Sequence, residues 1–306
     1  MKILVLTSMY PSKEKKYNGI FVKEQVDALS NEFNIHADVL DLSIYSSSLS
    51  RYILSSFKIL KTIIYGKPDI VHVHYGLTAF PLLILFPYIK LSGINIVTTF
   101  HGSDVLGSNK AVKLISQLTM KLYPNAICVS RQIYEKVNAK NKIYLPCGVD
   151  NMFINNRDDE ERKYILFGGD PDRLEKDYSR FEKIISNTTI PKDKIKVLKN
   201  LTRLQVRETL LKAKCLVLTS KHEGSPQIVK ESIGCNTPII STPVGDVPML
   251  VDNLEHSFTS DDNCSLSLKI EKLYKSDVKC DYTENVKYFS QSLTMNKLLD
   301  FYKSIV

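Results

Sequence analysis

Short runs of apolar, β-branched residues alternate with longer amphipathic segments along this chain of 306 residues. The runs are nearly continuous in Val, Ile and Leu, which is typical of strands buried on both faces of a parallel sheet. Parallel strands need long crossovers, usually helices. The predicted strands are Lys2–Thr7, Ala37–Leu40, Ile70–Tyr75, Ile94–Phe100, Ala126–Ser130, Lys142–Leu145, Tyr164–Phe167, Lys194–Leu198, Cys215–Thr219 and Pro238–Ser241. The predicted helices between them include Ile20–Asn31, Gln132–Asn138, Tyr178–Ser186, Arg203–Lys212 and Pro226–Cys235.

A polar run at Asp150–Lys163 interrupts this alternation. The chain length suits two domains of about 150 residues each. The pattern therefore predicts an α/β protein with two Rossmann-like domains in tandem, at residues 1–155 and 156–284. The last segment, residues 285–306, has an amphipathic helical pattern.

The most informative segment follows the predicted strand Cys215–Thr219. Ser225 is a plausible N-cap, and Pro226 suits the first position of a helix. Gly224 lets the backbone approach a ligand closely. A turn of this kind leaves the helix N-terminus open from Gly224 to Gln227, and its free N–H groups and dipole favour a diphosphate.

Two carboxylates flank this turn, Glu223 just before it and Glu231 in the second helical turn. A carboxylate accepts two hydrogen bonds side by side, which suits a vicinal diol. A nucleotide-sugar has a diol on each side of its diphosphate, so the arrangement predicts a nucleotide-sugar site. The simpler alternative is a capped helix with two solvated glutamates.

The pattern from Glu223 to Gly245 resembles the signature of the retaining family-4 glycosyltransferases, the glycogen-synthase-like group 1 with a GT-B fold. Three more segments are similar to this family in the same order: Asn18–Gln25, Thr99–Asp104 and Leu145–Asp150. The resemblance implies two Rossmann-like domains facing a central cleft, the first binding the acceptor and the second the nucleotide-sugar. It implies as well that the C-terminal helix, residues 285–306, packs back on the first domain. It also implies a UDP-, GDP- or ADP-sugar as donor substrate, with no other cofactor and no metal.

The resemblance assigns roles to residues of the second half. Glu231 would hold the ribose hydroxyls, and Glu223 would contact the transferred sugar. Arg173 and Lys176 would clamp the diphosphate, and two cations there would stabilise the leaving group without a metal. Solvated charges in a loop are the alternative for this pair. The triplet Asp170–Asp172 is interpreted as a coincidence and not as a metal site.

In the first half, His101 ends a predicted strand, where α/β sheets place ligands. The resemblance puts it beside donor sugar and acceptor, although a structural histidine is the alternative. Asp104 would orient His101 or take part in acceptor binding. His74 is a further acceptor candidate, although a packed histidine explains it as well. Gly19, at a helix start, could offer backbone N–H groups to the diphosphate.

The formal net charge of +8 is unevenly placed. Residues 1–150 carry 17 Lys and Arg against 10 Asp and Glu, whereas the rest carries 24 against 23. The first half is therefore expected to meet an anionic partner. Arg51–Tyr65 could lie on an anionic membrane surface, although an ordinary crossover helix explains it equally. Nucleic acid is not expected, because no basic cluster has aromatic partners in a recognisable module.

Together these features predict a metal-independent, retaining hexosyltransferase. Its acceptor would be a saccharide or lipid-linked saccharide of surface polysaccharide or glycolipid synthesis. The apolar run after Lys2 is too short for a signal peptide, and no two cysteines have C-x-x-C spacing. We therefore expect a cytoplasmic protein, peripheral on the inner face of the membrane. The alternatives are a non-catalytic nucleotide-sugar-binding subunit and a GT-B nucleotide-sugar epimerase.

Overall fold

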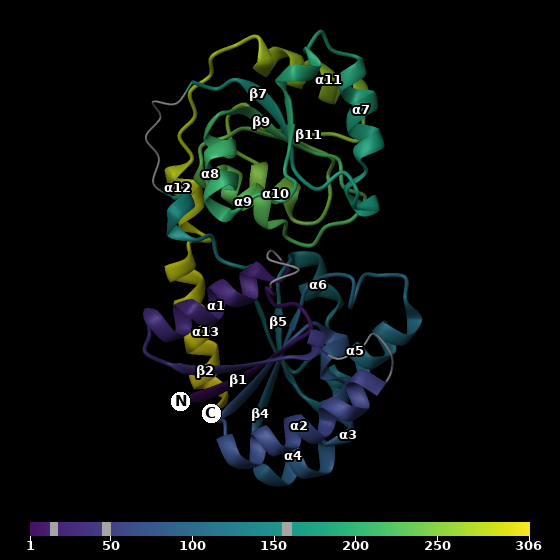
Figure 1. Ribbon diagram of the computed structural model, residues 1–306, viewed down its shortest axis with the longest axis vertical. Helices are drawn as coiled ribbons and strands as arrows, with labels where there is room; N and C mark the ends of the chain where they lie inside the picture. The colour runs from purple at the N-terminus through teal and green to yellow at the C-terminus, as the bar shows by residue number, and fades with distance from the viewer. Residues whose placement is uncertain (13–17, 45–49, 155–160) are drawn as a thin grey trace. The chain divides into compact units, whose positions relative to one another are not determined.

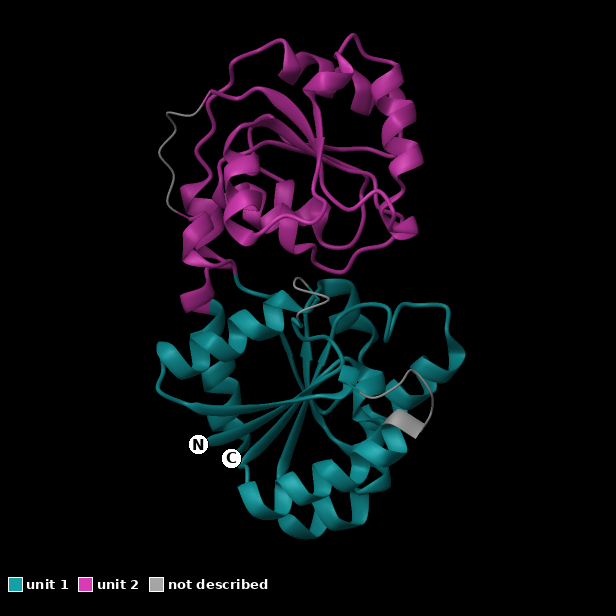
Figure 2. Cartoon of the chain, in the orientation of Figure 1, with its two compact units in different colours: residues 1–148, 294–306 teal, residues 149–293 magenta. Residues whose placement is uncertain are grey.

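A computed structural model describes residues 1–12, 18–44, 50–154 and 161–306. The chain forms two compact units, shown in different colours in Figure 2. Unit 1 comprises residues 1–148 and 294–306, and unit 2 comprises residues 149–293. The structure thus divides the chain between Gly148 and Val149, whereas the boundary expected at 155/156 lies outside the described residues.

Unit 1 is built on a parallel sheet of six strands in the order β2-β1-β3-β4-β5-β6 (Figure 1). Its strands are β1 (Lys2–Thr7), β2 (His36–Asp41), β3 (Ile70–His74), β4 (Asn95–Phe100), β5 (Asn125–Cys128) and β6 (Asn141–Tyr144). Its helices are α1 (Ile20–Asn31), α2 (Ser50–Gly66), α3 (Phe80–Ile84), α4 (Phe86–Ser92), α5 (Lys110–Leu122) and α6 (Arg131–Lys136), with short 3-10 turns η1 (Leu42–Ile44) and η2 (Gly76–Ala79).

Alternate residues of β1 enter two separate cores, as expected for a strand covered on both faces. Ile3 and Val5 pack with apolar residues of α1 and of the C-terminal helix α13 (Gln291–Ile305). Leu4 and Leu6 pack with apolar residues of α2, α3 and α4. The continuous apolar composition of the strand is therefore explained by helices on both sides of the sheet.

Unit 2 repeats this plan with a parallel sheet of five strands in the order β11-β10-β9-β7-β8. Its strands are β7 (Tyr164–Phe167), β8 (Ile195–Val197), β9 (Ala213–Leu218), β10 (Ile239–Ser241) and β11 (Phe258–Thr259). Its helical segments are η3 (Asn151–Phe153), η4 (Leu174–Lys176), α7 (Tyr178–Ser186), η5 (Lys192–Lys194), α8 (Arg203–Leu211), α9 (Gln227–Gly234), α10 (Val247–Val251), α11 (Asn263–Tyr274) and α12 (Thr283–Lys287). The prediction of two Rossmann-like α/β domains is confirmed.

The C-terminal segment is two helices and not the one that the amphipathic pattern suggested. α12 ends at Lys287 and α13 begins at Gln291. Between them, the backbone pairs with Val149, whose N–H donates to the Phe289 carbonyl and whose carbonyl accepts from Gln291 N–H. These two hydrogen bonds with Val149 take the place of hydrogen bonds that a continuous helix would make there. Residues 294–306 belong to unit 1, whereas residues 285–293 belong to unit 2.

Helix α13 is anchored to the centre of the unit 1 sheet by a buried polar contact. The Tyr302 hydroxyl lies 2.6 Å from Nδ1 of His72 on β3. The other ring nitrogen of His72 lies 2.7 Å from Thr99 Oγ1 on β4. Both nitrogens of this fully buried imidazole therefore have partners, as a buried polar group requires.

All six cysteines have free thiols, and four of them are buried.

In the described part of the chain, no helix is both long and apolar enough to cross a bilayer.

Candidate functional site

Each sheet has a point where successive strands are added on opposite sides, and α/β proteins bind ligands at the carboxyl ends of strands at such points. In unit 1 this point lies between β1 and β3, and in unit 2 between β7 and β9. Gly19 starts the helix after β1, and His74 ends β3. Lys176 and Glu223 lie in the segments that follow β7 and β9. The topology thus gathers these predicted site residues at one edge of each sheet.

The turn after β9 is shaped by a close approach of two backbone segments. A Cβ atom on Gly245 would lie 2.1 Å from the carbonyl oxygen of Gly224 and 2.6 Å from that of Glu223. Gly245 also has a φ of +53°, which favours glycine. The next N–H, that of Asp246, donates to the Gly224 carbonyl at 2.8 Å. Any side chain at position 245 would therefore displace the turn after β9, so the observed backbone conformation requires glycine there.

Helix α9 begins one residue later than expected. Pro226, with φ −65° and ψ 125°, is the N-cap, and Gln227 is the first helical residue. The prediction that Ser225 caps the helix is therefore wrong, because Ser225 precedes the cap and its hydroxyl accepts no capping bond. In the described structure, that hydroxyl is buried without a hydrogen-bond partner. The first N–H groups of the helix lack intrahelical acceptors, as in any α-helix.

Each of the two predicted glutamates is paired with a cation. Glu223 Oε1 lies 2.6 Å from Lys176 Nζ, and both side chains are largely buried. Glu231 Oε1 lies 2.8 Å from an Arg203 nitrogen, and the Glu231 side chain is only 3% exposed. The Arg203 guanidinium also lies over the Phe153 ring. Two ion pairs therefore flank the turn.

Arg203 was not identified as a site residue from the sequence, and the role of Arg173 in the diphosphate clamp stays a prediction. The Arg173 side chain is 59% exposed and binds Glu175, two residues along the chain. Arg203 starts helix α8 in the segment after β8, where Thr202 and Gln205 form a capping box. A cation placed just past the carboxyl end of a strand is the signal that could have identified it.

The acidic triplet near Arg173 is held by a lysine. Lys199 Nζ lies 2.5 Å from Asp172 and 3.7 Å from Asp170. These contacts give the two carboxylates a structural role in the loop after β7.

In unit 1, His74 and His101 are in contact. Nδ1 of His74 lies 3.1 Å from Nε2 of His101, and the rings are stacked. Phe21 of α1 packs on the His101 ring, and the two ring centroids are 4.9 Å apart. Burial lowers the pKa of His101 to about 4, and also lowers the pKa of His74. Both imidazoles are therefore neutral at physiological pH.

Asp104 is fully buried, and its hydrogen-bond partners among the described residues are backbone N–H groups. Its carboxylate accepts hydrogen bonds from the N–H groups of Gly76, His101 and Gly102, at 2.8 to 3.2 Å. Burial raises the pKa of this carboxyl group, while the three N–H donors oppose the shift. Asp104 thus fixes the backbone at His101 and ties it to the segment after β3.

Gly19 is the N-cap of α1 with a φ of +64°. A Cβ atom there would lie 2.1 Å from the Met9 carbonyl oxygen. The close approach of the two backbone segments explains this glycine on conformational grounds. A role in diphosphate binding stays a prediction.

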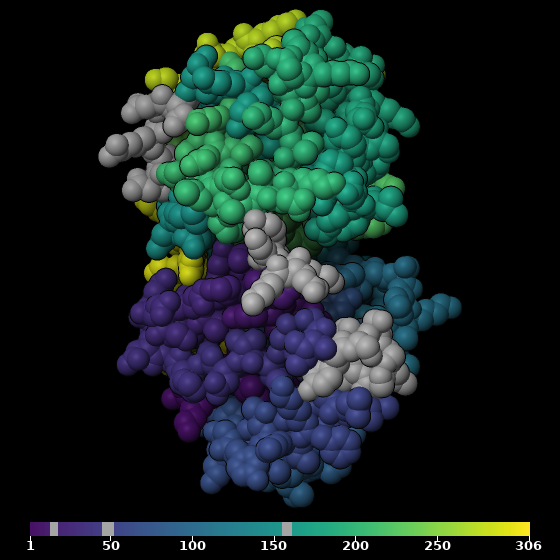
Figure 3. Space-filling view, viewed as in Figure 1, coloured from purple at the N-terminus to yellow at the C-terminus, as the bar shows by residue number. Residues whose placement is uncertain are grey.

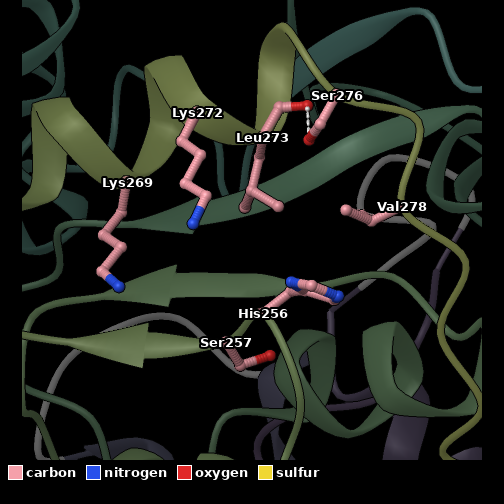
Figure 4. Close-up of a pocket in the computed structure, with 7 residues that line it drawn as sticks. All are labelled: His256, Ser257, Lys269, Lys272, Leu273, Ser276 and Val278. Carbon is pink, nitrogen blue, oxygen red and sulfur yellow. Dashed lines mark hydrogen bonds between the residues drawn. The ribbon is translucent and has the colours of Figure 1, made fainter.

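Unit 2 also has a cavity of about 220 Å³ between α11 and the β10–β11 region (Figure 4). None of the predicted site residues lines it. Its Ser257 and Ser276 hydroxyls already have hydrogen-bond partners, and Lys269 lies over the Phe258 ring. This cavity is therefore a weaker candidate than the turn after β9.

Residues 12–151 match the family described as Glycosyltransferase Family 4, and residues 151–291 match Glycosyl transferases group 1. An uncharacterized glycosyltransferase of Methanocaldococcus jannaschii is 25% identical over 80% of this chain and 77% of its own. A candidate teichuronic acid biosynthesis glycosyltransferase of Bacillus subtilis is 22% identical over 94% of each chain. The structure of Anabaena HepE in complex with UDP and glucose has a TM-score of 0.74, with 11% identity over 99% of this chain and 100% of the other.

The fold and the two family matches define the class of protein. This chain belongs to the group 1, family-4 glycosyltransferases and has their two-domain, Rossmann-like GT-B fold.

We predict that Gly245→Ala displaces the turn after β9, because its methyl group would overlap the Gly224 carbonyl. Gly93→Ala is a matched control, since Gly93 also has a positive φ, +71°, but nothing within 4 Å of an added Cβ. The control should lose only the cost of a left-handed alanine, about 1–2 kcal/mol. Urea unfolding should show a clearly larger loss for Gly245→Ala. Equal losses would contradict the close approach.

Proposed function

We propose that unit 2 binds a nucleoside-diphosphate sugar and that the chain transfers its hexosyl group with retention of configuration. The observation that carries this is the start of α9, which lies between two carboxylates, each held by its own cation. Helix N–H groups suit the diphosphate, and buried carboxylates suit sugar hydroxyls. The UDP and glucose bound by HepE, a protein of the same fold, support this choice of ligand.

Within this proposal, Glu231 binds the ribose hydroxyls, with Arg203 fixing its orientation. Gly224, Ser225 and Gln227 face the diphosphate, where the buried Ser225 hydroxyl gains the partner that it lacks in the described structure. Glu223 binds the hydroxyls of the transferred sugar. Lys176 lies beside Glu223 and offers a positive charge to the leaving diphosphate.

The proposed reaction breaks the bond between C1 of the sugar and the diphosphate oxygen, which keeps the electron pair. The acceptor oxygen bonds to C1 on the same face, and its proton passes to the released nucleoside diphosphate. Lys176 compensates the developing charge in this scheme, which needs no metal ion.

We predict that the transfer reaction does not depend on a metal ion. Activity that persists in excess EDTA would support this, and activity that EDTA abolishes would contradict it.

Unit 1 is proposed to bind the acceptor, with His101 close to the transferred sugar. Its neutral imidazole offers hydrogen bonds without a charge, and His74 and Asp104 fix its position. The candidate role of a relative in teichuronic acid biosynthesis supports a saccharide or lipid-linked saccharide acceptor in surface polysaccharide synthesis.

We predict that one of UDP, GDP and ADP binds unit 2, measurable by calorimetry on the whole chain. Glu231→Gln should weaken this binding by about 1.5–3 kcal/mol, because it removes hydrogen bonds to a charged group. Glu182→Gln on α7 removes the same charge from the same unit and should bind as the wild type does. Thermal unfolding of each variant shows whether it folds. If none of the three nucleotides binds, the proposed donor site is wrong.

Product analysis separates transferase from the two alternatives. A transferase releases free nucleoside diphosphate as it glycosylates an acceptor, whereas an epimerase returns an altered nucleotide-sugar. A binding subunit does neither.

We further propose that helix α2 places unit 1 on the cytoplasmic face of an anionic membrane. Ile59 and Ile63 point into the core, whereas Leu54, Phe57 and Tyr65 are 58%, 72% and 78% exposed. Lys58 and Lys61 lie on the same helix, so the exposed part combines apolar and basic side chains. Residues of this segment reach the surface in the blue-purple part of Figure 3.

We predict that the protein sediments with vesicles containing phosphatidylglycerol but not with phosphatidylcholine vesicles. Leu54→Glu with Phe57→Glu should abolish binding, because it places two negative charges where apolar side chains would enter the lipid. Leu204→Glu, at an exposed leucine of α8, is the control. Sedimentation of the double variant at the wild-type level would contradict the proposed role of α2.

A further inference from the structure

Unit 1 contains a second cavity that the donor site does not explain. Its volume is about 640 Å³, within the range of ligand pockets. The residues that line it come from α5, from the end of α6 and from the loop after β4: Asp104, Val105, Lys113, Ser116, Gln117, Met120, Lys121, Lys136 and Asn138. The α5 residues follow at spacings of three and four, so one side of this helix forms a wall.

Three lysines contribute positive charge to this one cavity. Throughout the ranges that the structure describes, the ammonium groups of Lys113, Lys121 and Lys136 take part in no ion pair or hydrogen bond. Asp104 also lines the cavity, so three positive charges stand against one carboxylate, and the lining keeps a formal charge of +2. Lysines around a concavity attract anions, and phosphate and carboxylate oxygens are their usual partners.

Two amides stand beside these lysines. Gln117 and Asn138 both line the cavity. Ser116 also lines it, but the Ser116 hydroxyl packs against Gly76, since a Cβ added there would lie 2.1 Å from Oγ. Amide groups beside cations, in a cavity larger than one phosphate needs, fit a sugar that carries a charge.

The cavity is connected to the predicted acceptor residues through Asp104. One side of this residue lines the cavity, and its carboxylate holds the backbone N–H groups of His101 and Gly102. A ligand in the cavity would therefore contact the loop that carries His101.

We propose that this cavity binds a saccharide that carries a phosphate or carboxylate group. That this saccharide is the acceptor rests on the proposed function. The three lysines bind the anionic group, and Gln117 and Asn138 bind hydroxyls of the sugar.

Binding of glucose 6-phosphate, glucuronate and glucose to the whole chain tests the proposal. The two anionic sugars separate phosphate from carboxylate as the preferred group, and at least one should bind at least about tenfold more tightly than glucose. This preference should weaken as salt is added. Equal binding of all three sugars, or none, would overturn the proposal.

Variants locate the site. Replacing Lys113, Lys121 and Lys136 with Gln should abolish the preference for anionic sugars. Replacing Lys2, Lys67 and Lys90, which are exposed lysines away from the cavity, with Gln removes the same charge from the same unit and should leave the preference unchanged. If both triple variants lose binding equally, the cavity is not the site.

Chemical acetylation gives an independent readout. Bound glucose 6-phosphate or glucuronate should protect Lys113, Lys121 and Lys136 from acetylation, and should leave Lys269 and Lys272 of the unit 2 cavity reactive. Protection of the unit 2 pair alone would overturn the assignment. Nucleoside diphosphate binding is measured on the same samples. If UDP, GDP or ADP binds but neither anionic sugar does, only the proposal for the cavity fails.

Discussion

The contact on which the proposed donor site depends is the approach of Gly245 to the carbonyl of Gly224. It joins the segment after β10 to the turn after β9 and leaves no room for a side chain. The Asp246 N–H then holds the same carbonyl. With the turn fixed, Glu223 meets Lys176, and α9 begins at Gln227, directly after the turn. The position of the two carboxylates follows from a backbone contact and not from the glutamates themselves.

Burying the charges of these two ion pairs costs free energy, and this cost points to a role for the pairs in ligand binding. Glu231 and Lys176 are largely buried, and removing a charge from water is unfavourable unless it is paired. Arg203 and Glu223 supply those partners before any ligand arrives. A nucleotide-sugar offers hydroxyls and a diphosphate to the same four groups. Preorganised charges need little rearrangement when the ligand binds, which is how such sites stabilise a leaving group.

The sequence predicted the sheets well because buried parallel strands have a composition that few other elements share. β1 and β7, and the helices α1 and α7, have the predicted bounds. The two-residue strand β11 was missed because it is too short to show a pattern. The prediction of one continuous C-terminal helix was wrong, because hydrogen bonds with the distant Val149 interrupt the helix.

For the site, the local motif identified Glu223 and Glu231, and the resemblance named Lys176, the partner of Glu223, but Arg203, the partner of Glu231, was not identified. Arg203 lies 28 residues before Glu231, and only the sheet order brings the two together. The Ser225 cap failed for a smaller reason, because Pro226 adopts the extended conformation of a cap itself. Contacts set by tertiary structure were the ones that the sequence could not supply.

The central claim is that the backbone at the start of α9 holds the diphosphate of the donor. Amide hydrogen exchange with and without UDP, GDP or ADP at saturation measures this directly. The account predicts slower exchange in residues 224–231, with little change across α11. Unchanged exchange in residues 224–231, while a bound nucleotide protects another part of the chain, would contradict it.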